Sequence, residues 1–274
     1  MDQYKFSGIL HDPIDKSICL VCILRNIIKK SHEKRAEEVA KQLVSNIPSN
    51  VLSLIANHHA QNSPLGPADK NASAANRGII PHGTNVDDIC FQNSFSGYLI
   101  HLNTLRKLMY SGAICSIPSK FESIADYTNF SKLYWDLMHS YYSTYINSRL
   151  DVIARSIFLL PEDTRIPSSP IISHLAITSA LSMCPNDFYL VYVDIGGVQK
   201  FIASSRKTRD LWAASYIYSL LSASIIRYFA NKFGPDSVLI PWILEVPLAK
   251  SIIFGEAYDK EILLPLLPST ITAL

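Results

Sequence analysis

The chain has 274 residues, which is enough for one large domain or two ordinary ones and for a sizeable apolar core. Its 25 basic and 23 acidic residues give a net charge of +2, which excludes a strongly basic protein that coats nucleic acid over its whole surface. Hydrophobic residues make up 48% of the composition, so we expect extensive burial, some of it against partner chains.

Membrane insertion and disulfide bonding are not expected. The apolar run at residues 18–28 is broken by Arg25, is too short to span a bilayer, and is followed by no cleavage site of small residues. The five cysteines are odd in number and fit no disulfide framework. Cys19 and Cys22 have the spacing of a metal-binding pair, but a zinc site needs four ligands, so core thiols are the preferred interpretation. These features predict a cytoplasmic protein.

The N-terminal two thirds of the chain is predicted to be helical. Apolar residues recur at helical spacing in residues 18–30, 33–44, 98–109, 121–130, 133–159 and 171–183. A segment rich in Asn, Ser, Gly and Pro at residues 61–83 predicts a loop with a short helix at about residues 69–77. No strand is predicted before residue 184.

A change of pattern at residues 184–187, Cys-Pro-Asn-Asp, predicts a domain boundary. The apolar run at residues 188–193 is typical of a fully buried strand. A helix at residues 211–233, which ends at Gly234-Pro235, and strands at residues 237–243 and 251–254 are predicted to follow. The predicted fold class is α+β, with a helical domain at residues 1–185 and a partial ferredoxin-like β-α-β domain at residues 186–274.

A glycine-rich, basic segment joins the predicted strand to the predicted helix. Asp194 ends the strand, and Gly196 and Gly197 allow the backbone to approach a ligand closely. The basic residues of the segment are Lys200, Arg206, Lys207 and Arg209. Such a segment can bind phosphates, pair with acidic groups of a neighbouring subunit, or be an ordinary solvated turn. Asp194 suits a metal ligand and a cap of the strand end equally well.

The strongest catalytic candidates are His11 and Asp12. A histidine beside an aspartate can hold one divalent metal, or bridge two, if further ligands converge from other helices. The available ligands are His32, His58, His59, Asp69 and His174. Without such convergence the pair is an Asp that caps a helix next to a surface His.

Four motifs, in order, resemble the large subunit of type III-B CRISPR effector complexes, the Cmr family. They are LHDP at residues 10–13, ADKNAS at 68–73, LPEDTRIP at 160–167 with His174-Leu175 behind it, and DIGGVQKFI followed by RKTRDLWAAS at 194–215. The resemblance spans nearly the whole chain, although residues 83–158 match little.

The resemblance implies an HD-type helical domain, which in some members of the family is a metal-dependent nuclease for single-stranded DNA and in others is degenerate. It implies catalytic roles for His11 and Asp12. It also implies a divalent metal (Mn, Ni, Co or Mg) held by these two residues with His58, Asp69 and His174. Related large subunits often have Asp-His where this chain has Ser173-His174, so one carboxylate is expected to be missing.

The second domain resembles the first palm domain of the same family, which implies an ATP site shared with a second palm that carries a Gly-Gly-Asp-Asp motif. The one Asp-Asp pair here, Asp87-Asp88, lies in the helical part. Asp194, the two glycines and the four basic residues would form one wall of that site. The sequence therefore resembles only the first part of a large subunit, either as a natural split or as a truncation.

The resemblance further implies several partners: the remaining half of the large subunit, other Cmr subunits, guide RNA and target RNA, with single-stranded DNA as a substrate and no membrane. Two other functions remain open. One is a structural scaffold subunit with a degenerate HD site, and the other is a stand-alone HD phosphohydrolase that acts on nucleotides.

Overall fold

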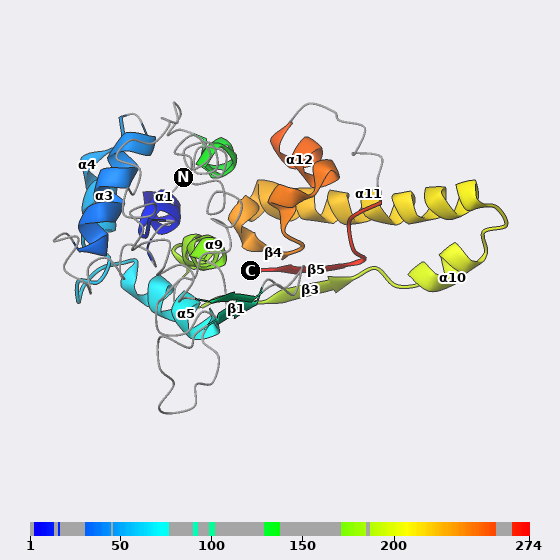
Figure 1. Ribbon diagram of the computed structural model, residues 1–274, viewed down its shortest axis with the longest axis horizontal. Helices are drawn as coiled ribbons and strands as arrows, with labels where there is room; N and C mark the ends of the chain where they lie inside the picture. Colours follow the sequence, from blue (N-terminus) through cyan, green and yellow to red (C-terminus); the bar gives the residue numbers. More distant parts are fainter. Residues whose placement is uncertain are drawn as a thin grey trace. The chain divides into compact units, whose positions relative to one another are not determined.

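The structure is a computed structural model that divides into two compact units, Met1–Pro185 and Asn186–Leu274 (Figure 1). It describes residues 3–13, 16, 31–44, 46–76, 90–92, 99–101, 129–137, 171–184, 187–255 and 265–274. Within these residues, no helix combines the length and the apolar character that crossing a membrane requires.

The first unit is built mainly from short helices. Its described helices are α1 (Gln3–Leu10), α3 (His32–Leu43), α4 (Ser49–Ala56), α5 (Gly66–Asn76) and α9 (Ile171–Leu181), and residues 130–137 are also helical. Helix α1 contacts α4 and α9, α9 also contacts α5, and α3 contacts α4. The predicted helices at residues 33–44, 69–77 and 171–183 are confirmed as α3, α5 and α9.

Helix α1 is buried along most of its length. Phe6, Ile9 and Leu10 are all buried, and the Phe6 ring packs edge-on against Phe130 at a centroid distance of 5.4 Å. The backbones of α1 and α9 lie close together at Gly8, where an added Cβ would come within 2.7 Å of the Ser179 Cα. Glycine therefore lets the two helices approach each other directly.

Helix α3 begins at a serine cap. The Ser31 side chain accepts a hydrogen bond from the Lys34 backbone N–H at 3.5 Å, which places His32 at the first helical position. One face of the helix carries the buried residues Ala36, Val39, Ala40 and Leu43. The opposite face is charged, as expected for a helix at the surface of a domain.

Two short strands in the first unit contradict the sequence prediction. β1 (Cys90–Gln92) pairs antiparallel with β2 (Leu99–His101), with Phe91 opposite Ile100. The prediction that no strand precedes residue 184 is therefore wrong, as is the predicted helix over Leu99–His101. A strand of three residues is too short to show the period-two pattern that distinguishes it from a helix. The predicted helix at residues 18–30 lies outside the described residues, as do most of those at 121–130 and 133–159.

The second unit combines a small sheet with helices. Its elements are β3 (Val191–Asp194), α10 (Val198–Ala203), α11 (Thr208–Phe233), η3 (Pro235–Ser237), β4 (Val238–Ile240), η4 (Ile243–Glu245), α12 (Pro247–Phe254) and β5 (Thr270–Ala273). The described sheet has the order β3-β5-β4, and β5 is antiparallel to both neighbours. Strands β3 and β4 are therefore parallel to each other and joined through α11, so the β-α-β arrangement is present with β5 inserted between its strands.

Helix α11 packs on one face of this sheet, and α12 packs against α11 (Figure 1). The core joins Ala223 and Ile226 of α11 to Val238 and Ile271 of the strands. The Ser222 hydroxyl donates a hydrogen bond to the Pro268 carbonyl at 2.6 Å and so ties α11 to the segment that leads into β5. The helix predicted at residues 211–233 from its helical spacing of apolar residues is confirmed as part of α11.

The prediction of a fully buried strand at residues 188–193 is wrong. Tyr189 is 83% exposed, and Tyr192 is also exposed. In the described sheet β3 lies at one edge, and the register places Tyr192 opposite Thr272, while Val193 pairs with Ile271 of the core. Because successive side chains of a strand point to opposite faces, Tyr192 lies on the face away from α11.

Three further predictions need correction. Residues 251–254 are not a strand but the end of α12, which begins at Pro247, a favoured first residue of a helix. The strand predicted at residues 237–243 is shorter, because Pro241 follows β4 directly. The basic segment after Asp194 is not simply a loop, since α10 lies within it. Strand β5 was not predicted at all.

Candidate metal centre

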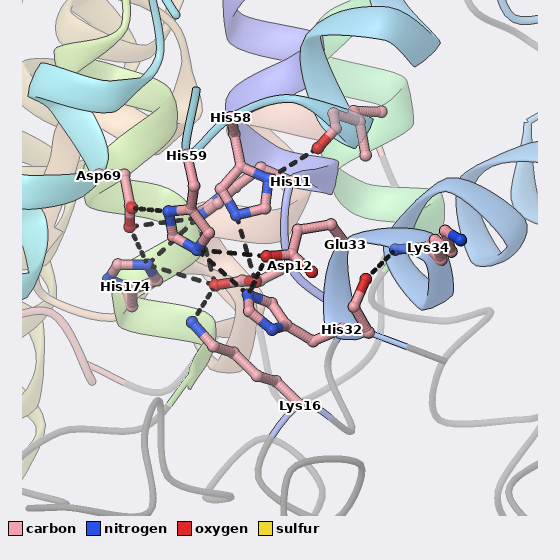
Figure 2. Close-up of polar contacts among 12 residues, drawn as sticks. His11, Asp12, Lys16, His32, Glu33, Lys34, His58, His59, Asp69 and His174 are labelled. Atoms are coloured by element: carbon pink, nitrogen blue, oxygen red, sulfur yellow. Dashed lines mark hydrogen bonds and ion pairs between the residues drawn. The ribbon is translucent and has the colours of Figure 1, made fainter. Parts of the chain in front are cut away.

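Histidine and aspartate side chains from well-separated parts of the first unit converge on one place, as Figure 2 shows. His11 and Asp12 follow α1, His32 begins α3, His58 and His59 follow α4, Asp69 lies on α5, and His174 lies on α9. The close approach of α1 and α9 brings the first and last of these elements together.

Four of these residues form a buried inner group: His11, Asp12, Asp69 and His174, whose ligand atoms all lie within 4.8 Å of one another. The Nε2 atom of His11 lies 3.2 Å from Nε2 of His174 and 3.3 Å from Oδ2 of Asp12. The Nε2 atom of His174 lies 3.2 Å from Oδ1 of Asp69. Two imidazoles and two carboxylates thus point toward a common centre.

His32, His58 and His59 form an outer group, again with ligand atoms within 4.8 Å of one another. The Nε2 atoms of His32 and His59 are 3.1 Å apart. His58 is buried, whereas the His59 side chain is 47% exposed, so this group opens toward solvent. The Glu33 carboxylate lies beside it, with Oε1 3.5 Å from Nε2 of His32.

The Asp12 carboxylate lies between the two groups. Its Oδ2 atom faces the inner group, 3.3 Å from Nε2 of His11 and 3.7 Å from Nε2 of His174. Its Oδ1 atom faces the outer group, 3.9 Å from Nε2 of both His32 and His58. This is the placement expected of a carboxylate that bridges two cations.

Backbone carbonyls orient two of the imidazoles. The Nδ1–H group of His11 donates to the Gly8 carbonyl at 2.6 Å, and that of His58 donates to the Ile55 carbonyl at 2.7 Å. With Nδ1 occupied in this way, Nε2 is the atom that each ring presents to the centre. Such outer hydrogen bonds commonly fix the orientation and tautomer of metal-binding histidines.

The protonation states follow from burial and from the neighbouring charges. Burial, reinforced by nearby His11, lowers the pKa of His58 to about 4, so its ring is neutral and keeps a lone pair. Burial alone would lower the pKa of His11, but the Asp12 and Asp69 carboxylates outweigh it and raise that pKa to about 10. Burial alone would also raise the pKa of Asp12, but Lys16 and His11 hold it well below its usual range.

Two buried atoms of the centre have no hydrogen-bond partner among the described residues, namely Oδ1 of Asp12 and Nε2 of His58. They lie 3.9 Å apart. An isolated buried polar atom of this kind is costly, and a divalent cation would accept an electron pair from each. The residues present therefore fit divalent metals. A set of five imidazoles and two carboxylates favours Mn, Co or Ni over Mg, which prefers oxygen ligands.

The structure brings together all five residues that were predicted to hold metal: His11, Asp12, His58, Asp69 and His174. His32 and His59 were available ligands in the sequence but were not assigned, and neither Lys16 nor Glu33 was considered. The one local sequence feature that could have drawn attention to His32 is its position directly after the helix-capping Ser31. Residue 173 is a serine, so the carboxylate that related subunits often carry there is missing as expected, and Asp69, which was already among the predicted ligands, lies beside His174.

The predicted nucleotide-binding residues lie in the second unit. Asp194 ends β3, Gly197 has a φ of 80° and precedes α10, and Tyr218 donates to the Gly196 carbonyl at 3.3 Å. Lys200, Arg206, Lys207 and Arg209 are all exposed, and they lie on α10, on the first turn of α11 and on the segment between them. Among the described residues, no group with metal-ligand spacing includes Asp194.

The sequence is similar to that of a CRISPR-associated subunit. A family model described as "CRISPR-associated protein Cmr2, N-terminal" matches residues 190–274. The Cmr2 subunit of Pyrococcus furiosus is 41% identical over 115 residues, which are 42% of this chain and 13% of that protein. The Cmr2 subunit of Saccharolobus solfataricus is 28% identical over 263 residues, which are 87% of this chain and 23% of that protein.

The fold is similar as well. A chain in the cryo-EM structure of type III-B Cmr-beta in its apo state matches with a TM-score of 0.52 at 23% identity, over 98% of this chain and 29% of that one. The chain thus spans less than a third of each of these relatives. These matches show that the chain is similar to CRISPR-associated subunits of the Cmr type. The chain is related to the N-terminal part of the large subunit, Cmr2, and the resemblance seen in the four motifs is confirmed.

Proposed function

We propose that this chain is the N-terminal part of a type III-B Cmr large subunit in RNA-guided antiviral defence, and that its metal centre is an HD-type nuclease site for single-stranded DNA. The observation that carries the proposal is the position of Asp12 between the inner and outer groups. A surface His beside a helix-capping Asp would need none of these neighbours, and both His11 and Asp12 are fully buried.

The inner and outer groups would each hold one divalent ion, with Asp12 contributing one oxygen to each. Ions bound there would supply Lewis-acid stabilisation of a phosphodiester and a water of lowered pKa. The residues of the inner group exclude water because they are buried, while the exposure of His59 leaves the outer group accessible. The DNA backbone would therefore approach from the side of His59 and Glu33.

The proposal is tested by metal content and cleavage of the purified chain. We expect about two equivalents of Mn, Co or Ni per chain, cleavage of a single-stranded oligonucleotide with those metals, and loss of cleavage in a chelator. His11→Ala should reduce both metal content and cleavage, whereas Asn57→Ala, an exposed change beside His58, should alter neither. A folded chain without metal would favour the scaffold function, and hydrolysis of mononucleotides but not DNA would favour the phosphohydrolase.

We propose that the second unit forms one wall of an ATP site. The second palm domain, in the remaining part of the large subunit, would complete that site. Asp194 lies opposite Thr270 on the face of the sheet away from α11, and Gly196 and Gly197 follow it in the chain. Tyr189, Tyr192 and Trp212 leave apolar surface exposed for a partner to cover. Other Cmr subunits, guide RNA and target RNA are the further partners in this proposal.

If the ATP site is shared in this way, we expect that this chain alone makes no oligoadenylate. Combined with a partner that carries the Gly-Gly-Asp-Asp palm, and with guide and target RNA, it should convert ATP to oligoadenylate. Asp194→Asn should lower that rate by about 100-fold, since a metal ligand at a reacting phosphate contributes several kcal/mol. Asp187→Asn, an exposed change before β3, is the control. Synthesis by this chain alone, or an unchanged rate in Asp194→Asn, would contradict the shared site.

A further inference from the structure

Lys16 places an ammonium group inside the metal centre. Its Nζ atom donates to Oδ2 of Asp12 at 2.5 Å, and its side chain is only 12% exposed (Figure 2). The same Oδ2 atom is the one that faces Nε2 of His11 and of His174. Lys16 is thus paired with the oxygen that Asp12 would offer to a cation in the inner group.

An ammonium and a divalent cation cannot share this oxygen without strong repulsion, because like charges a few ångströms apart in a buried site are poorly screened. We propose that Lys16 and the inner metal compete for Asp12, and that metal binding transfers the Lys16 ammonium to a phosphate of the substrate. Lys16 is a positioning residue in this exchange. The transfer of the ammonium to a substrate phosphate rests on the proposed nuclease function, whereas the competition for Asp12 does not.

The chemistry of lysine suits such an exchange. A lysine carries a compact charge on a flexible stem of four carbons, so its ammonium can change partner without movement of the backbone. The three carboxylates of the centre, Asp12, Asp69 and Glu33, would repel an anionic substrate. A released ammonium at the edge of the centre offsets that repulsion and binds a phosphate oxygen directly.

The alternative is an ordinary ion pair between residues four apart in the sequence. Such a pair exists on α3, where Nζ of Lys41 lies 2.5 Å from Oε1 of Glu37. The Lys41 side chain is 51% exposed and lies outside the inner and outer groups. Lys41→Met therefore removes the same kind of contact without affecting the centre, and it is a matched control for Lys16→Met.

The experiment measures metal and DNA affinity separately in the full chain. Titration calorimetry with MnCl₂ should show about tenfold tighter binding at one of the two positions in Lys16→Met, because a competing charge-assisted hydrogen bond is removed. At saturating Mn²⁺, Lys16→Met should bind a fluorescent phosphorothioate thymidine oligonucleotide about tenfold more weakly. Lys16→Arg should retain weaker metal binding than Lys16→Met, and Lys41→Met should match the wild type in both measurements.

The proposal requires both tighter Mn²⁺ binding and weaker oligonucleotide binding in Lys16→Met, and the absence of either change overturns it. Unchanged or weaker metal binding in Lys16→Met would show that Lys16 only supports the fold, and the nuclease function would be unaffected. Tighter metal binding without DNA cleavage by any variant would refute the nuclease function and leave the competition for Asp12 standing. If Lys16→Met does not fold, Lys16→Gln keeps a hydrogen-bond donor without the charge and gives the same test.

Discussion

Replacing Asp12 by Asn is expected to remove both of the proposed metal ions and to reduce the proposed DNA cleavage by on the order of 10³-fold. The reason is the position of the carboxylate, whose two oxygens face different groups of ligands. An amide has nearly the same shape but no negative charge, so it offers each cation a weaker ligand. Metal analysis of the purified variant and single-turnover cleavage are the two measurements.

Two other substitutions provide the comparison for Asp12→Asn. His174 belongs to the inner group and His32 to the outer group, whereas Asp69 has one oxygen near each group, so His174→Ala and His32→Ala should each lose about one equivalent of metal. The opposite pattern, with two metals retained in Asp12→Asn or a double loss in each single-group variant, would show that Asp12 does not connect two separate positions.

Replacing Gly8 by Ala is expected to lower the free energy of unfolding of the first unit by about 3 kcal/mol. The added Cβ would lie 2.7 Å from the Ser179 Cα, an atom of the backbone, so the helices α1 and α9 must move apart. Because the Gly8 carbonyl accepts a hydrogen bond from Nδ1–H of His11, that movement also displaces the His11 imidazole, a candidate metal ligand. Denaturant unfolding measures the first effect, and metal titration measures the second.

Gly66→Ala is the matched control for this change. An added Cβ at Gly66 would meet the His58 carbonyl oxygen at 3.5 Å, which is ordinary van der Waals contact, so the change in unfolding free energy should stay below about 1 kcal/mol. Equal effects of the two substitutions would mean that the close contact at Ser179 does not set the distance between α1 and α9.

The sequence predicted the fold best where an element is long or strongly periodic. The apolar positions of α11 recur over 26 residues, and α3 has a serine cap and one buried face, so both helices were predicted close to their bounds. Strands β1, β2 and β5 have three or four residues each, too few for a period to emerge. The apolar composition of residues 188–193 predicted burial, but composition does not tell whether the chain itself or a partner buries a segment.

The candidate metal ligands were predicted mainly where they are adjacent in sequence or fall within a motif, and His58 was assigned without a motif. His11 and Asp12 are neighbours, and Asp69 and His174 lie in or beside motifs of the family. His32 and His59 join the centre because α3 packs against α4, a contact that no local pattern reveals. The role of Lys16 depends on which carboxylate oxygen it approaches, which only the arrangement of the folded side chains defines.

The separation of the ligands along the chain has a consequence during synthesis. His11 and His174 meet through their Nε2 atoms although 163 positions separate them. A nascent polypeptide that has not yet emerged from the ribosome as far as α9 therefore holds an incomplete set of ligands. In the proposed nuclease, an unfinished copy would therefore lack the complete centre, and no separate inhibitor would be required to keep it from cutting DNA.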